Sequence, residues 1–352
     1  MTKKLKVGII GCGEIAFSKH MPGLNKLRDV EMTAFCNRSI EKAERAAAEF
    51  GAEVSRVFTD YKKLLEDDEL DLVHICTPNN SHAEISTAAL KAGKDVMCEK
   101  PMALNAEEAE LMYQTAQEYG QKLSVSYQNR FKAENILFKE LIESGKLGKV
   151  YFARSLALRR RGVPTWGYFL DKEIQGGGPL IDIGTHSLDL TLWLLDNYQP
   201  KIVLANVFNE MAGESSEANY FGPWEKEKFE VEDAAVAHII MEDGTTVFLE
   251  CSWALNTPED YDIKTVLSGR KAGADNINGL RINGEKEGRL YKEEISTASS
   301  ANEDPGEREM RLWIEAVKED KEPPVKAEQA LVVAKILDAI YKSAETGEAV
   351  KF

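Results

Sequence analysis

Short apolar runs alternate with amphipathic segments through the first 126 residues of the chain. Each run is short and nearly continuous in aliphatic residues, as is typical of parallel strands buried on both faces. The segments between them have helical spacing, and two of them end at Gly51 and Gly93, which favour helix termination. This alternation predicts an α/β domain with a doubly wound parallel sheet. The runs that we interpret as strands are 5–10, 30–36, 71–76, 95–98 and 122–126.

The pattern changes after Tyr127, where strand-like runs follow one another without long helices between them. Glu242-Asp243-Gly244 has the composition of a hairpin turn. We therefore expect an α+β domain with a large, mostly antiparallel open sheet. The predicted domains are 1–126 and 127–352, and the closing helices within 307–346 can pack back towards the first domain. The expected strands of the second domain are 150–158, 201–206, 234–241, 245–253 and 263–267.

The first strand-like run leads into Gly11-Cys12-Gly13-Glu14-Ile15-Ala16, which fits the G-x-G-x-x-A pattern. In this pattern the first glycine permits a tight turn, and the second lets the backbone approach a pyrophosphate at the N-terminus of the next helix. The motif alone is a weak signal, but here it stands between a strand and a helix, as its chemistry requires. We expect Gly11, Gly13, Glu14 and Ile15 to contact a dinucleotide.

The second strand-like run ends at Asn37-Arg38-Ser39, where an acid would normally bind the adenosine ribose. That acid is missing here. Asn37 can hydrogen-bond a ribose, and Arg38 and Ser39 can receive a 2′-phosphate. These residues favour NADP over NAD by a small margin. The alternative is that Arg38 is a solvated residue at the start of a helix.

A run of three glycines, 176–178, opens the stretch with the densest candidate chemistry. We expect the glycines to keep the loop open to a ligand, and Pro179 suits the first turn of the helix that follows. On that helix Asp182 and His186 are four residues apart and share one face, with Asp189 close to the same stripe. A carboxylate beside an imidazole can orient the ring for general-base catalysis. The alternative is a structural pairing of a buried histidine.

Composition then narrows the classes of function. A chain of 352 residues exceeds the size at which one core keeps growing, which agrees with two domains. The net charge of −15 argues against nucleic acid or an anionic membrane as a partner. No apolar run approaches the ~20 residues of a membrane span, and the first run is too short for a signal peptide, so we expect a cytoplasmic protein. We expect the isolated cysteines to be core residues in a reducing compartment: Cys12, Cys36, Cys76, Cys98 and Cys251.

Together, the motifs resemble the glucose–fructose oxidoreductase and inositol dehydrogenase family (Gfo/Idh/MocA) over nearly the whole chain. Such membership implies a Rossmann domain, an α+β domain whose open sheet often forms the interface of a homodimer or homotetramer, and NAD- or NADP-dependent oxidation or reduction of a sugar or cyclitol hydroxyl. The chain departs from the family at Asn37, where many members have an acid. The resemblance rests on the glycine loop, Thr77-Pro78-Asn79 with His82, Glu99-Lys100-Pro101, Gln128-Asn129-Arg130-Phe131, the stretch 176–189 and Gly269.

By position, Lys100, Asp182 and His186 match the catalytic lysine, aspartate and histidine of the family. His186 is then the base for the hydroxyl proton, Lys100 polarises the oxygen, and Asp182 orients the substrate or the imidazole. We interpret Trp166, Arg159 and Arg161 as candidates for the sugar pocket, along with the catalytic residues, and we expect no metal. The resemblance implies further cofactor contacts at Thr77, Pro78, Asn79, His82, Glu99, Lys100 and Asn129.

The sequence leaves two other functions open. A branch of the superfamily cleaves glycosides through transient oxidation by bound NAD and elimination, and a non-catalytic dinucleotide-binding regulator is also possible. The presence of Lys100, Asp182 and His186 argues against the regulator. If the chain is an NAD(P)-dependent sugar or polyol dehydrogenase, these three residues must converge on one interdomain cleft, within reach of one small ligand. The acidic segment 213–232 is expected to be a polar loop, either a lid or an interface arm.

Overall fold

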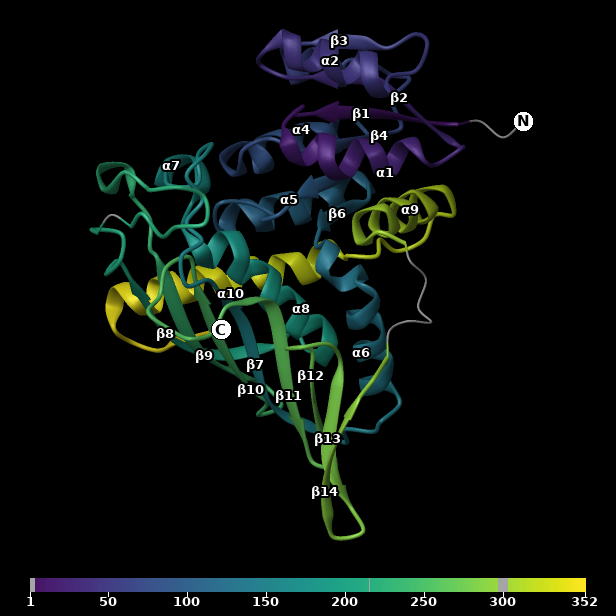
Figure 1. Ribbon diagram of the computed structural model, residues 1–352. Helices are drawn as coiled ribbons and strands as arrows, with labels where there is room; N and C mark the ends of the chain where they lie inside the picture. The colour runs from purple at the N-terminus through teal and green to yellow at the C-terminus, as the bar shows by residue number, and fades with distance from the viewer. Residues whose placement is uncertain (1–3, 215, 297–302) are drawn as a thin grey trace. The chain divides into compact units, whose positions relative to one another are not determined.

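The computed structural model describes residues 4–214, 216–296 and 303–352 (Figure 1). The chain forms two compact units. The first contains Met1–Gln128 and Glu303–Leu331, and the second contains Asn129–Asn302 and Val332–Phe352. No helix among the described residues is both long and apolar enough to cross a membrane. All five cysteines are free and buried, which confirms their interpretation as small core residues.

The first unit is built on a six-stranded sheet in the order β3-β2-β1-β4-β5-β6, and all neighbouring pairs are parallel. The strand order reverses between β1 and β4, at the switch point beyond which such sheets bind ligands. The predicted doubly wound sheet is therefore confirmed. The edge strand β3 was not predicted, because its three residues are largely exposed and form no buried run. The strands are β1 Leu5–Ile10, β2 Val30–Cys36, β3 Arg56–Phe58, β4 Leu72–Ile75, β5 Asp95–Glu99 and β6 Leu123–Ser126.

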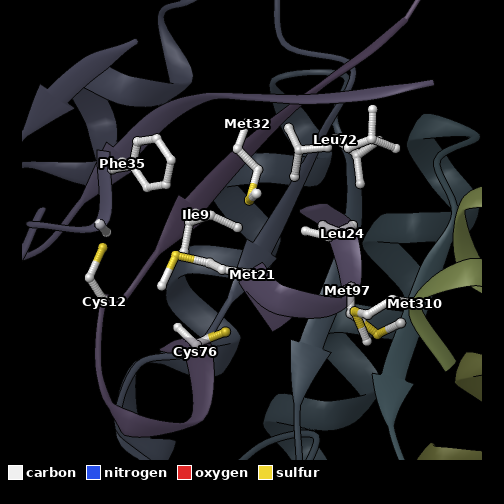
Figure 2. Packing of buried hydrophobic residues seen from close by; sticks show 14 of the residues in the cluster. Ile9, Cys12, Met21, Leu24, Met32, Phe35, Leu72, Cys76, Met97 and Met310 are labelled. Carbon is white, nitrogen blue, oxygen red and sulfur yellow. The ribbon is translucent and has the colours of Figure 1, made fainter. Parts of the chain in front are cut away.

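Helix α9 (Pro305–Lys318) returns to this first unit from late in the chain and packs against α1. Its Met310 is fully buried in the same hydrophobic cluster as Ile9 and Met21 (Figure 2). Its Trp313 is also fully buried in this cluster. A closing helix therefore completes the core beneath the glycine loop. The other helices and turns of this unit are η1 Ala16–His20, α1 Met21–Asn25, α2 Ile40–Phe50, α3 Tyr61–Leu65, η2 Asn79–Ser81, α4 His82–Lys91 and α5 Ala106–Tyr119.

The second unit is built on a nine-stranded sheet in the order β14-β13-β12-β11-β7-β10-β9-β8-β15. Every neighbouring pair is antiparallel except β7 and β10, which confirms the mostly antiparallel sheet. Helix α8 packs on β7 and β11, and the turn before it packs on β10 (Figure 1). The strands are β7 Val150–Leu158, β8 Pro200–Phe208, β9 Ala234–Met241, β10 Thr246–Ser252, β11 Tyr261–Gly269, β12 Ala272–Asp275, β13 Arg281–Lys286, β14 Arg289–Glu294 and β15 Val350–Lys351.

Four of these strands, β12 to β15, were not predicted. The β13–β14 hairpin is polar and mostly exposed, so it lacks the apolar alternation by which a half-buried strand is recognised. Strand β12 consists of small residues and an aspartate, and β15 has two residues. The remaining elements are η3 Gln128–Phe131, α6 Ala133–Glu143, α7 Lys172–Gln175, η4 Leu180–Gly184, α8 Thr185–Leu195, η5 Lys226–Lys228 and α10 Ala327–Thr346.

Candidate functional site

The glycine loop follows β1 at the carboxyl edge of the parallel sheet. Gly11 has a φ of +95°, and a Cβ atom there would lie 2.5 Å from the backbone of Cys76, so only glycine fits. A Cβ atom at Gly13 would meet no described atom within 4 Å. The backbone at Gly13 is therefore open to an incoming group, while Gly11 is needed for packing inside the protein.

A helix begins at Glu14, directly after the loop, and continues through the π-helical turn η1 into α1. The first N–H groups of a helix have no acceptor within the helix and attract anions. Glu14 is exposed and Ile15 is partly exposed. An open glycine backbone followed by a helix N-terminus at the switch point of the sheet fits the pyrophosphate of a dinucleotide.

Asn37 supports the glycine loop from the end of β2. Its Oδ1 accepts a hydrogen bond from the backbone N–H of Cys12 at 3.2 Å, and its Nδ2 donates to the carbonyl of Ser39 at 3.0 Å. Ser39 Oγ in turn donates to Glu41 Oε2 at 2.6 Å. Asn37 and Ser39 are therefore both engaged within the protein, and of the three residues that were expected to bind the adenosine ribose or its 2′-phosphate, Arg38 is the exposed one.

Glu41 is a residue that the sequence analysis missed. It lies on the first turn of α2, and the hydrogen bond from Ser39 lowers the pKa of its carboxyl group, so it is charged at neutral pH. The acid that usually binds the ribose directly follows the second strand, whereas Glu41 lies five residues beyond the end of β2. A carboxylate here attracts ribose hydroxyls and repels a 2′-phosphate, which opposes the effect of Arg38.

His82 links two of the predicted cofactor loops. Its Nδ1 lies 2.8 Å from the carbonyl oxygen of Pro101, and its Nε2 lies 2.9 Å from that of Thr77. The side chain is fully buried, and burial lowers its pKa, so a neutral ring donates one of these bonds at a time. His82 therefore ties the loop after β4 to the segment after β5 that includes Lys100. Direct contact of Thr77, Pro78, Asn79 or His82 with a cofactor stays a prediction.

Glu99 lies at the centre of a buried ionic network behind Lys100. Its Oε1 accepts from Lys19 and lies 2.7 Å from His20 Nε2, and its Oε2 accepts from the backbone N–H of Lys100 at 3.1 Å. Burial alone would raise the pKa of Glu99, but Lys19 and His20 outweigh burial and hold this pKa well below its usual value. Glu99 is therefore an anion that anchors the backbone of Lys100, and its contact with a cofactor stays a prediction.

The same network continues to helix α9. Lys19 donates to Ser126 Oγ at 2.6 Å, and Ser126 Oγ donates to Glu309 Oε2, also at 2.6 Å. Burial would lower the pKa of Lys19, but Glu99 and Glu309 outweigh burial and raise it. Lys19 of η1 and Glu309 of α9 thus help to fix the segment that includes Lys100. The sequence offered no local signal for this network, since its members lie far apart along the chain.

Asp182 and His186 lie in the second unit, on one continuous helix that begins at Pro179. Asp182 is in the π-helical turn η4 and His186 in the first turn of α8, and both side chains are largely buried. Asp182 Oδ2 accepts a hydrogen bond from Trp253 Nε1 at 3.1 Å. Single π-helical turns within helices are frequent at functional sites, because they alter the direction of the side chains that follow.

The three glycines before this helix make room for protein groups. A Cβ atom at Gly177 would lie 1.9 Å from Tyr341 Oη, and one at Gly178 would lie 2.0 Å from the carbonyl oxygen of Glu232. These glycines were expected to leave space for a ligand. For Gly177 and Gly178 this expectation is wrong, because Tyr341 and Glu232 occupy the space beside them.

Glu232 caps the N-terminus of the helix that bears Asp182 and His186. Its carboxylate accepts hydrogen bonds from the backbone N–H groups of Gly178 at 2.9 Å and Leu180 at 3.1 Å, and from Tyr341 Oη at 2.9 Å. Burial raises the pKa of Glu232 although these three donors oppose the shift. Glu232 was not predicted, because it lies more than 50 residues beyond the start of this helix in the sequence.

Asp189, three residues beyond His186, binds the arginine of the Gln128-Asn129-Arg130-Phe131 motif. Its two carboxylate oxygens accept from Arg130 Nε at 2.9 Å and Nη2 at 2.5 Å, and both side chains are almost fully buried. The carbonyl of Asn129 accepts from Asn135 Nδ2 at 2.7 Å. Asp189 therefore fixes turn η3 to helix α8. Contact of Asn129 with a cofactor stays a prediction.

The predicted sugar-pocket residues differ in their surroundings. Arg159 donates to the carbonyl of Gly162, and Arg161 donates to Asn256 Oδ1 at 2.6 Å. Trp166 is 52% exposed and packs edge-on against Phe169 at 5.6 Å between ring centroids. Phe169 lies 6.3 Å from Trp253, the partner of Asp182.

The structure thus joins Asp182 to Trp253 in the second unit, with His186 on the helix of Asp182, and in the first unit it fixes the backbone of Lys100 through Glu99. Convergence of Lys100 with Asp182 and His186 stays a prediction. Among the described residues, no group of three or more His, Cys, Asp or Glu side chains is arranged to hold a metal ion.

Two family models match the sequence. The model described as an oxidoreductase family with an NAD-binding Rossmann fold (GFO/IDH/MocA) matches residues 5–127, and that of the GFO/IDH/MocA C-terminal domain matches residues 136–275. The chain is also 35% identical to D-glucoside 3-dehydrogenase of Escherichia coli (strain K12) over 347 residues, which cover 99% of this chain and 97% of that protein.

Solved structures with a similar fold include levoglucosan dehydrogenase in complex with NADH and L-sorbose, with a TM-score of 0.84 and 22% identity over 99% of both chains. Aldose-aldose oxidoreductase from Caulobacter crescentus, complexed with glycerol, has a TM-score of 0.81 and 24% identity over 99% of this chain and 100% of that one. At these identities the structures support the two-part fold.

Proposed function

Because the chain belongs to the GFO/IDH/MocA oxidoreductase family, we propose that it transfers a hydride between a nicotinamide dinucleotide and a secondary hydroxyl or keto group of a sugar. The observation that carries the proposal is the arrangement on one helix of a buried carboxylate, held by Trp253, and an imidazole four residues further on. The relative named D-glucoside 3-dehydrogenase, similar over nearly the whole chain, favours a D-glucoside as the substrate class.

The roles of the residues follow from the chemistry of alcohol oxidation. A nicotinamide dinucleotide, when bound, would supply the hydride acceptor for this oxidation. His186 accepts the hydroxyl proton as the carbonyl forms, and Lys100 stabilises the negative charge that develops on the oxygen. Asp182, held through its Oδ2, orients the substrate or the imidazole. This mechanism requires Lys100, Asp182 and His186 to reach one ligand.

The cofactor is proposed to bind along the carboxyl edge of the parallel sheet. Gly13 and the N-terminus at Glu14 would hold the pyrophosphate, because the backbone there is open. The ribose of the adenosine would lie near Arg38 and Glu41. Asn37 supports the loop through the backbone N–H of Cys12.

The proposal is tested with a panel of polyols, aldoses and glycosides, each assayed with NAD and with NADP by the absorbance of the reduced nicotinamide. We expect glycosides to reduce the nicotinamide, with an increase in its absorbance. Cleavage of glycosides without net formation of reduced cofactor would instead favour the oxidation–elimination glycosidase. Tight dinucleotide binding without turnover of any sugar in the panel would favour a regulator.

Substitution of Arg38 tests the preference for NADP. We expect Arg38→Ala to weaken NADP binding by about tenfold and NAD binding much less, because a guanidinium gains most from the extra phosphate charge. Dissociation constants from calorimetry measure this effect. Lys42→Ala, which removes an exposed cation from helix α2 just after Arg38, is the matched control. Equal losses for the two cofactors in Arg38→Ala would show that Arg38 is only a surface residue.

We also propose that the protein assembles as a homodimer or homotetramer through the open face of the nine-stranded sheet. Leu204, Val236 and Phe248 are exposed on β8, β9 and β10, and the strand register places them on one face. Phe248 also stacks on His238 and packs edge-on against Phe152. An apolar row of this kind marks a surface for association.

Substitution of Phe248 by Glu is expected to reduce the mass in solution to that of a single chain, because a buried unpaired charge opposes association. Light scattering coupled to size-exclusion chromatography measures this mass. Leu111→Glu, on exposed apolar surface of α5, is the control and should leave the mass unchanged. An unchanged mass in Phe248→Glu would exclude this face as the interface.

A further inference from the structure

The second unit contains a pocket of about 370 Å³ that includes neither Asp182 nor His186. One wall is formed by the loop that contains Trp166 and Tyr168, and another by residues 223–230. The volume falls within the ~300–1,000 Å³ of small-molecule sites. The acidic segment that was expected to be a lid or an interface arm thus supplies one side of a pocket.

The two walls are held together by hydrogen bonds within the protein. Buried Asn219 pairs with both backbone groups of Val163, at 2.8 and 2.9 Å. The N–H of Glu230 donates to the carbonyl of Leu170 at 3.1 Å. Such a pocket is largely formed before a ligand arrives, which reduces the entropy cost of binding.

A layer of aromatic rings separates this pocket from Asp182. On one side, Phe169 lies between Trp166 and Trp253, at 5.6 and 6.3 Å between ring centroids. On the other, Phe229 lies 6.4 Å from the same Trp253, whose Nε1 binds Asp182. A small molecule in the pocket therefore cannot also reach Asp182, so any ligand of the pocket is separate from the molecule that meets this carboxylate.

The lining of the pocket is strongly negative. It contains four carboxylates and one cation, Lys228, which donates to Glu225 at 2.8 Å. Among the described residues, none of the other three carboxylates forms an ion pair. The uncompensated charge attracts a cation and repels an anion. The four carboxylates are those of Asp171, Glu225, Glu227 and Glu230.

The arrangement of these carboxylates favours an organic cation over a metal ion. Asp171 lies on the wall that contains Trp166, and the three glutamates lie on the other. No three acidic, histidine or cysteine side chains in the described part of the chain are close enough together to hold a metal ion. Carboxylates distributed around a pocket suit a charge that is itself spread over a small molecule.

The aromatic side chains of the lining suit the same kind of ligand. Trp166 is 52% exposed and Tyr168 is 47% exposed, and Trp224 lines the pocket with them. The faces of such rings attract ammonium groups through their quadrupoles, and Trp is the most effective of the three aromatic residue types. The C–H groups around an alkylated nitrogen can pack on these rings while the carboxylates balance the charge.

Trp224 also offers a donor that the protein does not use. The residue is 3% exposed, and its Nε1–H has no acceptor among the described residues. Buried N–H groups ordinarily have a partner. Because Trp224 lines the pocket, an oxygen atom of a ligand is a suitable acceptor. A hydroxyl oxygen fits better than a carboxylate, which would bring a further negative charge into a negative pocket.

We propose that this pocket binds a small organic cation that also carries a hydroxyl group, namely an amino alcohol or its quaternary ammonium form. The site is separate from the one that contains Asp182 and His186, and nothing in its assignment depends on the sugar that the protein oxidises. The inference therefore goes beyond the proposed function, and its test requires no turnover.

The experiment is a calorimetric titration of the full chain with choline and two analogues. Tetramethylammonium lacks the hydroxyl group, and the neutral isostere of choline has a tert-butyl group in place of the trimethylammonium group. We expect choline to bind with a Kd of about 1 mM or tighter. The neutral isostere should bind about tenfold more weakly, because it lacks the charge, and tetramethylammonium about fivefold more weakly, because it lacks the acceptor.

Variants of the lining then locate the bound choline. Trp166→Ala should weaken binding about tenfold, and Trp166→Phe less, because a smaller aromatic face remains. Tyr119→Ala removes an exposed aromatic residue of α5 in the first unit and should leave the Kd unchanged. Glu227→Gln keeps the shape of the side chain and should weaken binding about threefold. Its matched control is Glu217→Gln, in an exposed carboxylate of the same acidic segment that lies outside the lining.

The last titration repeats the measurement in the presence of saturating methyl β-D-glucoside, which should leave the Kd of choline unchanged. Displacement of choline by the glucoside would overturn the assignment, because the pocket would then belong to the sugar site. A neutral isostere or tetramethylammonium as tight as choline would overturn the class of ligand. Choline binding that is absent, or that is unaffected by both Trp166→Ala and Glu227→Gln, would overturn the site. A failure of every sugar to reduce the nicotinamide would instead contradict the proposed function alone.

Discussion

Replacement of His186 by Ala, or of Lys100 by Met, is expected to lower turnover by ~10²-fold or more while cofactor affinity stays nearly intact. His186→Ala removes the group that accepts the hydroxyl proton, and Lys100→Met removes the cation that stabilises the developing alkoxide. Both variants keep the glycine loop and the helix N-terminus at Glu14, which are proposed to hold the pyrophosphate and to supply most of the dinucleotide affinity. The measurements are the steady-state rate of nicotinamide reduction and the cofactor dissociation constant by calorimetry.

Two controls separate catalysis from structure. Lys91→Met removes an exposed cation at the end of α4 and should leave turnover unchanged. Added imidazole should restore part of the activity of His186→Ala, because a free base can occupy the vacated space, whereas it cannot repair a distorted fold. Normal turnover in His186→Ala would remove this residue from the role of base, and normal turnover in Lys100→Met would remove the lysine from the stabilisation of charge.

Glu232→Ala is expected to destabilise the protein by about 3 kcal/mol and to lower kcat by about tenfold with a smaller change in KM. The substitution leaves two backbone N–H groups and the hydroxyl of Tyr341 without their acceptor, at the N-terminus of the helix that positions Asp182 and His186. Urea unfolding measures the first effect, and steady-state kinetics with the best glycoside measures the second.

The capping role is tested against a helix that bears no candidate catalytic residue. Asp304 accepts from the N–H groups of Gly306 and Glu307 at the start of α9, so Asp304→Ala should cost about 1 kcal/mol and leave kcat unchanged. Tyr341→Phe, which retains the two backbone hydrogen bonds of Glu232, should have a smaller effect than Glu232→Ala. If kcat were unchanged in Glu232→Ala, Glu232 would be a purely structural residue.

The contacts of Tyr341 and Glu232 also explain two of the three glycines. Any side chain at Gly177 would meet Tyr341, and any at Gly178 would meet the backbone of Glu232. The glycines, the cap and the tyrosine form one unit that fixes where the helix begins. The four-residue spacing of Asp182 and His186 has functional value only if the start of the helix is fixed in this way.

The local sequence was sufficient to predict the parallel sheet of the first unit. Five of its strands are runs that alternate with helical segments, and this periodicity depends only on which neighbours along the chain are apolar. The glycine loop could be predicted for the same reason, since its turn, close approach and helix start involve consecutive residues. The helix with Asp182 and His186 was likewise visible in the spacing. The polar hairpin β13–β14 was not, because neither of its faces is buried.

What the sequence did not reveal depends on residues brought together from distant segments. Asn37 was predicted to bind the ribose and Glu99 to contact the cofactor, and both contacts stay predictions. The sequence did not reveal that the amide of Asn37 supports Cys12, or that the carboxylate of Glu99 binds Lys19 and His20. A side chain that can serve a ligand can also serve a backbone group, and the choice between them depends on which atoms the fold places within about 3 Å.

The sequence by itself therefore determined the fold class, the family and the helix that bears the candidate base, because each is encoded in the order and spacing of nearby residues. Only the tertiary structure decided that Glu232 caps this helix, that Trp253 holds Asp182, and that residues 223–230 face Trp166 across a pocket. Each of these contacts joins segments about 50 or more residues apart, and a hydrogen bond or ring contact over that separation leaves no periodic trace in the sequence.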